Sequence, residues 1–281
     1  MVIKMNQNMK HEFAVADEIY KYLSENAKNI RIDTVYEIGS TNDEMKKRAA
    51  SGEDEIAVLI AEHQTAGKGR RGRSFYSPEG TGIYMSILLR PDYPPEECTL
   101  LTTMAASSVA RAIEGVTGAR AQIKWVNDIF LNEKKVAGIL TEVAVAPDRQ
   151  KLSWAVVGIG INLESPEKGF PEELKEIAGS LLEEKEKGVK NRLIAEIINN
   201  FTADYQSFSE RKYLRDYRDR LFFLNEEITV IEGDRTYKAT AIDIDSMCHL
   251  KVRLHDGSEK LLFGGEISIR SNQGSSVVSS Q

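Results

Sequence analysis

The order of apolar and polar positions before residue 225 predicts strands and helices that alternate along the chain. Apolar runs, either alternating or continuous, predict strands at 30–39, 55–62, 82–91, 122–143 (several short strands with tight turns) and 152–163. Apolar residues at helical spacing predict helices within 13–29, 40–51, 99–118 and 183–210. This interleaving is typical of an α/β or α+β domain in which helices flank a sheet.

The pattern changes near Asn225. From there to Ser271 the chain has only short β-rich runs, separated by turn signals such as Asp256-Gly257, and this predicts a small β-barrel. The tail after Ser271 is polar and of low complexity, which predicts disorder. We therefore expect four parts: an N-terminal helix and arm (1–30), a main domain (31–223), a small barrel (224–271) and a tail (272–281).

Composition limits the classes of function that fit. The chain has 281 residues, with 37 Lys plus Arg against 43 Asp plus Glu, and its net charge is −6, whereas proteins that coat nucleic acid are basic. Its two cysteines, Cys98 and Cys248, lie far apart, so neither a disulfide framework nor a zinc site is indicated. No stretch has the roughly 20 apolar residues of a membrane span, and the first residues do not look like a signal peptide. We expect a cytoplasmic protein with no membrane partner.

One short segment runs against the acidic composition. Residues 63–75, HQTAGKGRRGRSF, carry cations at positions 68, 70, 71 and 73, with glycines at positions 67, 69 and 72. Glycine lets the backbone approach a ligand, and arginine can grip phosphate with two hydrogen bonds. The segment therefore fits a cradle for a nucleotide phosphate or a carboxylate. A mobile basic surface loop or a nucleic-acid patch fits the same composition equally well, and neither a Walker A nor a Rossmann glycine pattern is present.

Three further stretches carry candidate chemistry, each with a structural alternative. KWVND (124–128) offers a lysine for a phosphate and two polar turn residues, but on its own it reads as an ordinary turn. EKKVAGIL (133–140) places two lysines at a hairpin, where lysines are more often solvated than catalytic. GIGIN (158–162) has glycine at alternate positions of an apolar strand, which leaves one face bare for a flat group or for close helix packing.

Taken together and in order, these stretches resemble the bacterial biotin–protein ligases. The matching pieces are STN at 40–42, HQTAGKGRRGRSFYSP at 63–78, KWVNDIFLNEKKVAGIL at 124–140, VVGIGINL at 156–163 and GGEISIRS at 264–271. The resemblance implies a class II aminoacyl-tRNA synthetase-like mixed sheet with flanking helices, followed by an SH3-like barrel. It also implies two reactions. Biotin and MgATP give biotinyl-5′-adenylate and pyrophosphate, and the adenylate then acylates one lysine of a biotin carboxyl carrier domain.

The resemblance also implies a set of site residues. Those expected to bind biotin are Ser40, Thr41, Asn42, Gln64, Gly67, Lys68, Arg70, Lys135 and Gly138. Those expected to bind ATP are Arg70, Arg73, Phe75, Lys124, Asn127, Asp128, Asn162, Glu266 and Arg270. The catalytic candidates are Lys135, Arg70, Arg73 and Asp128. Mg²⁺ is expected to arrive with ATP, without dedicated protein ligands.

Three positions depart from the family pattern. Lys68 replaces the usual arginine, and lysine makes no bidentate contact. Val126 replaces a common proline, which predicts a less rigid turn, and Phe75 replaces tryptophan, which predicts weaker adenine stacking.

We expect a monofunctional ligase and not a repressor, because one short helix before the first strand is too little chain for a helix-turn-helix. A lipoate or octanoyl ligase of the same fold and a biotin-responsive DNA-binding regulator are the alternatives. The sequence leaves a homodimer open.

The chemistry of the two implied steps assigns different needs to the site. The first step joins two anions, so cations must cancel their repulsion, and no general base is needed because the carboxylate is already ionised at neutral pH. In the second step the carrier lysine must lose a proton before it attacks. Asp128 is the candidate acceptor or orienting group for that step.

Overall fold

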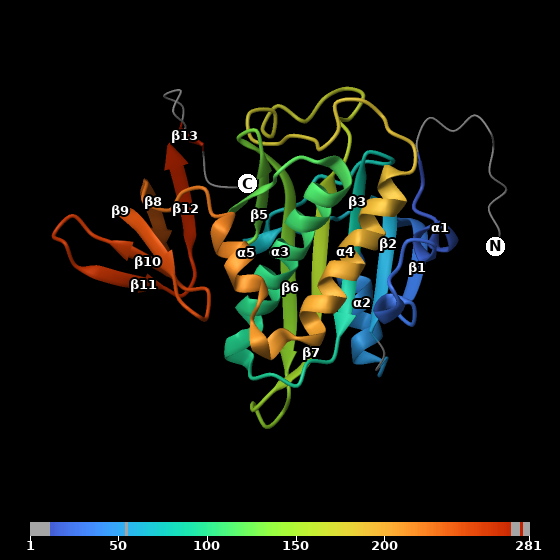
Figure 1. The fold of residues 1–281 in the computed structure, drawn as a ribbon, viewed down its shortest axis with the longest axis horizontal. Helices are drawn as coiled ribbons and strands as arrows, with labels where there is room; N and C mark the ends of the chain where they lie inside the picture. Colours follow the sequence, from blue (N-terminus) through green and yellow to red (C-terminus); the bar gives the residue numbers. More distant parts are fainter. Residues whose placement is uncertain (1–11, 54–55, 271–275, 278–281) are drawn as a thin grey trace.

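The computed structural model describes residues 12–53, 56–270 and 276–277. Seven strands form one mixed sheet in the order β1-β2-β3-β7-β6-β5-β4 (Figure 1). Strands β1 and β2 are parallel, and every other neighbouring pair is antiparallel. The strands are β1 (Arg31–Ile38), β2 (Ala57–Gln64), β3 (Gly82–Leu89), β4 (Gln122–Lys124), β5 (Asp128–Leu131), β6 (Lys134–Val145) and β7 (Leu152–Asn162). The strands predicted from the apolar pattern are thereby confirmed.

Helices cover both faces of this sheet. In Figure 1, α3 (Cys98–Thr117) and α4 (Val189–Gln206) lie in front of the sheet, and α5 (Tyr213–Asp219) lies beside them. On the opposite face, α2 (Thr41–Ala50) packs through Met45 and Ala49 on a small apolar cluster. Side chains of one strand point alternately to the two faces, so alternate residues of β2 supply both cores. The face that carries α2 also carries the pocket described below.

The first helix is shorter than its apolar spacing predicts. It comprises only α1 (Ala16–Tyr20), followed by a 3-10 turn at Glu25–Ala27. The side chain of Asn199, on α4, donates to the carbonyl of Tyr22 and accepts from the N–H of Ser24. Because these backbone groups bond to α4 and not within a helix, the helix ends there.

A second difference lies near the end of the main domain. Helix α5 follows a 3-10 turn at Phe208–Glu210 and was not predicted. Its two buried tyrosines, Tyr213 and Tyr217, are four residues apart, and that spacing was the available signal. The charged run 183–187 lies before α4, outside the helix, as a solvated loop.

The N-terminal strap, residues 12–15, crosses the start of α4. The Glu12 carboxylate accepts a hydrogen bond of 2.9 Å from the N–H of Gly188, the residue that caps α4. Lys190 is only 2% exposed, forms an ion pair with the equally buried Glu62 of β2, and donates to the Glu12 carbonyl. The strap therefore rests on a buried ion pair that joins α4 to the sheet.

The remaining strands form a second, antiparallel sheet of order β11-β10-β9-β8-β12-β13, on the left in Figure 1. They are β8 (Glu227–Glu232), β9 (Arg235–Ile244), β10 (Leu250–Arg253), β11 (Glu259–Leu262), β12 (Glu266–Arg270) and β13 (Ser276–Val277). The Trp125 indole donates to the Cys248 carbonyl at 2.8 Å, and this bond ties the two sheets together. The expected succession of a helix-flanked mixed sheet and a small β domain is confirmed. The tail predicted as disordered contains β13, and its other residues lie outside the described part.

Candidate active site

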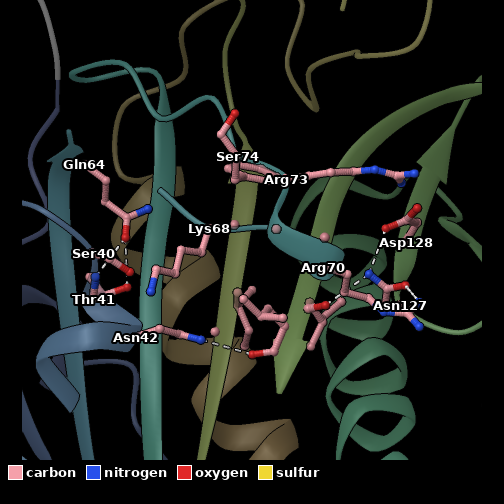
Figure 2. Close-up of a pocket in the computed structure, with 18 of the residues that line it drawn as sticks. Ser40, Thr41, Asn42, Gln64, Lys68, Arg70, Arg73, Ser74, Asn127 and Asp128 are labelled. Carbon is pink, nitrogen blue, oxygen red and sulfur yellow. Dashed lines mark hydrogen bonds between the residues drawn. The ribbon is translucent and has the colours of Figure 1, made fainter. Parts of the chain in front are cut away.

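A pocket of about 690 Å³, including the part open to solvent, lies between α2, strands β6 and β7, and the basic segment at 63–75 (Figure 2). Elements distant in the sequence meet there, and β12 of the second sheet contributes Glu266. Thirteen predicted site residues line it: Ser40, Thr41, Asn42, Gln64, Lys68, Arg70, Arg73, Phe75, Asn127, Asp128, Lys135, Gly138 and Glu266. The motifs singled out in the sequence therefore converge on one cavity.

One end of the pocket is a network of uncharged polar groups. Ser40 precedes the first turn of α2, where its hydroxyl faces the N–H of Asp43 at 3.5 Å. The Gln64 side-chain oxygen accepts from the Thr41 N–H at 2.9 Å and from the Thr41 hydroxyl at 3.1 Å. The Gln64 amide donates to the Ser77 hydroxyl at 3.1 Å. These bonds fix the side-chain orientations, so the end is built to recognise a polar, uncharged group.

Asn42 extends this network to the middle of the sheet. Its amide donates to the carboxylate of Glu142 at 2.9 Å, and its oxygen accepts from the Ser86 hydroxyl at 2.6 Å. Ser86 is fully buried, and its hydroxyl also lies 2.7 Å from the Thr41 hydroxyl. Sequence reasoning missed Ser86 and Glu142. A lone serine within the apolar strand GIYMSILLR was the signal for the first.

The two glycines of GIGIN leave space for pocket residues. A Cβ atom on Gly158 would overlap the amide of Asn42, and one on Gly160 would lie 2.7 Å from the ring of Phe75. The flat group expected on the bare face of this strand is therefore the Phe75 ring, while Asn42 takes the other space. Phe75 also meets Tyr84 edge to face. Together, Phe75 and the glycine strand make the apolar wall of the pocket.

The basic segment folds as a tight hairpin over the pocket. The N–H of Gly69 donates to the Arg73 carbonyl at 2.7 Å, and the N–H of Phe75 donates to the Gly67 carbonyl at 3.0 Å. Its tip is a 3-10 turn at Arg70–Gly72 in which Arg71 and Gly72 have φ of 56° and 77°. Glycine takes up such positive φ values without strain. A Cβ on Gly67 would lie 2.5 Å from the Phe75 carbonyl oxygen, so this position needs a glycine.

Each cation of the hairpin has a partner from another element. Lys68 pairs with Asp43 of α2 at 2.6 Å, and Arg70 donates to the Asn127 side-chain oxygen at 2.7 Å. The guanidinium of Arg73 contacts both oxygens of Glu266, at 2.8 and 3.0 Å, and Arg71 approaches the same carboxylate at 3.5 Å. The hairpin is thus fastened to α2, to the turn before β5 and to the second sheet.

A second group of charges lies on the sheet below the hairpin. Lys135 pairs with Asp128 at 2.8 Å, and the Asn127 amide donates to the same carboxylate at 3.0 Å. Lys124, opposite Asp128 in the β4–β5 pair, is 3% exposed, and its amine has no hydrogen-bond partner among the described residues. A buried ammonium without an acceptor is costly, so this position favours an anionic ligand.

Burial lowers the pKa values of two of these cations. Desolvation lowers the pKa of Lys124, and the nearby Asp128 carboxylate offsets part of the effect. Desolvation likewise lowers the pKa of Arg70. A positive charge that has already lost its water interacts strongly with an entering anion, because the local dielectric is low. The site can therefore hold a polyanion beside a neutral polar group.

Some predicted site residues lie outside the pocket wall. Asn162, at the end of β7, donates to the Gly179 carbonyl at 3.0 Å, and Gly67 and Lys124 are not among the residues that line the pocket. The backbone of Arg270 ends β12, while its side chain lies outside the described part of the structure. In the described residues no group of three or more His, Cys, Asp or Glu side chains could hold a metal ion. None of the helices described is long and apolar enough to cross a membrane.

Comparison with known proteins agrees with this geometry. The Biotin/lipoate A/B protein ligase family matches residues 35–162, and the Biotin protein ligase C terminal domain matches residues 223–270. The bifunctional ligase/repressor BirA of Bacillus spizizenii is 40% identical over 230 residues, which cover 80% of this chain and 70% of that protein. The biotin–[acetyl-CoA-carboxylase] ligase of Mycobacterium tuberculosis is 32% identical over 232 residues, which cover 78% of this chain and 82% of that protein.

Solved structures lead to the same family. The biotin protein ligase from Aquifex aeolicus in complex with biotin and ATP superposes with a TM-score of 0.68 at 26% identity. The match covers 85% of this chain and 97% of that chain. Sequence and fold therefore agree over both sheets, and the chain belongs to the biotin protein ligases.

Proposed function

We propose that this protein activates biotin with ATP and transfers it to one lysine of a biotin carboxyl carrier domain of a carboxylase. The observation that carries the proposal is the composition of the pocket: a preorganised neutral polar end lies beside the cations of the hairpin and of β4–β6. Biotin has a neutral polar head and an anionic tail, and ATP is a polyanion. A pocket of this kind can bind the two substrates end to end.

In this proposal the head group of biotin lies at the neutral end of the pocket. Ser40, Thr41, Asn42 and Gln64 would supply donors and acceptors that their mutual hydrogen bonds already orient. The apolar part of biotin would lie along the wall made by Gly158, Gly160 and Phe75. Its carboxylate would then face the backbone at Gly67 and Lys68, with Arg70, Lys135 and Gly138 nearby.

ATP would lie on the side of the second sheet. Its phosphates would meet Arg70, Arg73 and Lys124, of which Lys124 is buried and has no hydrogen-bond partner for its amine among the described residues. Asn127, Asp128, Asn162, Glu266 and Arg270 would surround the rest of the nucleotide, and Phe75 would pack on the adenine side. Binding a triphosphate here requires Arg73 to exchange part of its contact with Glu266 for phosphate oxygens.

The first step needs positioning and charge more than proton transfer. The biotin carboxylate oxygen attacks the α-phosphorus, the bond to the pyrophosphate leaving group breaks, and biotinyl-5′-AMP forms. Arg70, Arg73 and Lys135 stabilise the negative charge that gathers on the phosphates. The hairpin above the pocket would then shield the mixed anhydride from water.

In the second step the amine of the carrier lysine attacks the biotinyl carbonyl, an amide bond forms and AMP leaves. The amine must first be neutral. Asp128 is the proposed acceptor or orienting group, and its ion pair with Lys135 supports the orienting role.

Mg²⁺ would enter with ATP, held by the phosphates. The two carboxylates of the site, Asp128 and Glu266, are already paired with cations, so the residues present fit a metal carried by the nucleotide and not a resident one. Bound in this way, Mg²⁺ adds positive charge at the phosphates.

Biotin is favoured over lipoate by the second sheet. The family that matches residues 35–162 includes both kinds of ligase, whereas the domain that matches residues 223–270 is named for biotin protein ligases.

The net charge of −6 argues against a DNA-binding regulator. We place the reaction in the cytoplasm, where the free cysteines Cys98 and Cys248 would stay reduced. The reaction needs no second copy of the chain, and light scattering decides between monomer and homodimer.

The test is a direct assay. The protein is incubated with MgATP, a carboxylase carrier domain and either biotin or lipoate, and the carrier is analysed by mass spectrometry. We expect pyrophosphate release with biotin and a biotinyl mass gain on a single carrier lysine. Labelling with lipoate alone would favour the lipoate alternative. No heat with biotin in calorimetry and no pyrophosphate with either acid would overturn the proposal, and a DNA filter-binding signal at moderate salt would support a regulator.

A further inference from the structure

A chain of alternating charges links the basic hairpin to α2 and β6. Lys68 pairs with Asp43 at 2.6 Å, and Asp43 also pairs with Lys46 at 2.9 Å. Lys46 in turn pairs with Glu142 at 2.6 Å, and Glu142 accepts the amide of Asn42 at 2.9 Å. The chain thus runs from the hairpin to the neutral polar end of the pocket.

The first link of this chain joins two sides of the pocket. Lys68 forms an isolated β-bridge with Ser74 within the hairpin. Asp43 is the third residue of α2, directly after the pocket residue Asn42. Figure 2 shows the Lys68 side chain extending from the hairpin toward α2 and Asn42. The Lys68–Asp43 pair therefore holds the hairpin against α2 at the side where the neutral polar end lies.

We propose that Asp43 is a positioning residue whose carboxylate holds Lys68, and with it the hairpin, closed over the pocket. The inference rests on the proposed function and deepens it. Opening of the Lys68–Asp43 pair admits substrate, and its closing keeps the adenylate in the site. Lys68, which stands where the family has arginine, thus acts through a partner on this chain's own helix.

The surroundings of the pair make it reversible. The side chains of Lys68 and Asp43 are 41% and 37% exposed, and an ion pair at such exposure is weak and sensitive to salt. When Lys68 leaves, Asp43 keeps Lys46 as its counter-ion, so opening strands no unpaired carboxylate. Breaking a buried pair such as Lys190–Glu62 would instead leave a charge without its counter-ion in the interior, which is strongly destabilising.

Hydrogen exchange on the ligand-free protein tests whether the Lys68–Asp43 pair, called the latch below, holds the hairpin closed. This measurement does not depend on enzyme activity. In Asp43→Asn, we expect the hairpin amides, including those of Gly69 and Phe75, to exchange about two- to fivefold faster, the range for one exposed ion pair. Asp43→Glu should restore the slow rate. Lys46→Met is the matched control, because it removes the other partner of Asp43 and leaves Lys68–Asp43 intact. Unchanged exchange in Asp43→Asn, or equal acceleration in Lys46→Met, overturns the proposal.

Escape of the adenylate tests the role in the reaction. Protein loaded with biotin and MgATP is freed of substrates, and release of biotinyl-5′-AMP is followed over time. We expect Asp43→Asn to release it about two- to fivefold faster while forming it at nearly the wild-type rate. Added salt should speed release from the wild type but not from Asp43→Asn. Equal release rates and equal salt responses would show that the pair does not retain the intermediate.

The double variant Asp43→Asn with Lys68→Met separates a pair effect from two independent ones. If the residues act through one contact, exchange in the double variant equals that of Asp43→Asn alone, whereas independent effects add. A wild-type protein that forms no adenylate would defeat the proposed function. The exchange measurements would still decide whether the latch exists.

Discussion

Gly158 is a position where one added methyl group would alter recognition. A Cβ atom there would overlap the Asn42 amide, and Asn42 can move only by breaking its bonds to Ser86 and Glu142. In Gly158→Ala we expect the Kd for biotin in calorimetry to rise by about tenfold, equivalent to about 1.4 kcal/mol. Gly115→Ala, on α3 where a Cβ meets nothing within 4 Å, is the control and should bind normally. If Gly158→Ala bound biotin with wild-type affinity, Asn42 would not be a biotin-binding residue.

Asp128 allows the two steps of the reaction to be separated. Asp128→Asn keeps the shape of the side chain but removes the charge that holds Lys135 at 2.8 Å. We expect transfer from pre-formed adenylate to the carrier to slow by about a hundredfold, typical for loss of a proton acceptor or its orienting group. Rapid-quench measurement of the second step alone gives the rate. A normal rate would exclude Asp128 from that step.

A site residue was predictable from the sequence when its partners lie near it in the chain, and was missed when they lie far away. Residues such as Asn127 and Asp128 were predictable, because the residues of their motif are neighbours in the sequence. The pairs Asn42–Glu142 and Lys68–Asp43 join residues 100 and 25 positions apart. They depend on which strands are neighbours and in what register, so Glu142 and Asp43 were not recognisable before the structure.

At the scale of elements, the strap, α4 and β2 share one buried ion pair. Lys190→Met would leave the Glu62 carboxylate buried without its cation, and we expect the free energy of unfolding to fall by about 3–5 kcal/mol. The double variant with Glu62→Gln should recover part of the loss. Urea unfolding of both variants measures this. A loss below about 1 kcal/mol in Lys190→Met would mean that water or another group compensates Glu62.

The predicted bounds of an element are wrong where hydrogen bonds to distant residues replace those within the element. The apolar spacing over 13–29 continues past Tyr20, but Asn199 of α4 takes over the backbone groups there. Strands were predicted well, because strands such as β3 are buried throughout and almost entirely apolar, so they stand out in the sequence. Helix α5 is short, and its apolar signal is limited to one turn or two, so it escaped notice.

For the molecule as a whole, several surface carboxylates set the response to acid. Hydrogen bonding with Arg218 lowers the pKa of Asp243, where α5 meets β9. At Asp33 and Asp245, bonds to neighbouring cations and amides outweigh the opposing effect of burial, and the pKa is again lowered. A carboxyl whose folded pKa lies below its unfolded one stabilises the fold above the unfolded pKa, and this contribution is lost as pH falls through the folded value. At Asp204, burial raises the pKa, and its effect has the opposite sign.

We therefore expect the free energy of unfolding to fall as pH drops below about 4, where unfolded aspartates begin to bind protons. Urea unfolding across this range measures the slope. Asp243→Asn should be less stable near neutral pH and should show a smaller further loss in acid. The same slope in Asp243→Asn and wild type would mean that the Arg218 pair contributes nothing.

The carboxylate that meets Arg73 comes from β12, 193 positions after the arginine in the sequence. A ribosome must therefore translate β12 before Arg73 can meet its partner. Until then the nucleotide side of the pocket lacks the wall to which Glu266 belongs. Competence to react is thus delayed until β12 has been made, and fragments that stop short of Glu266 should be inert toward ATP.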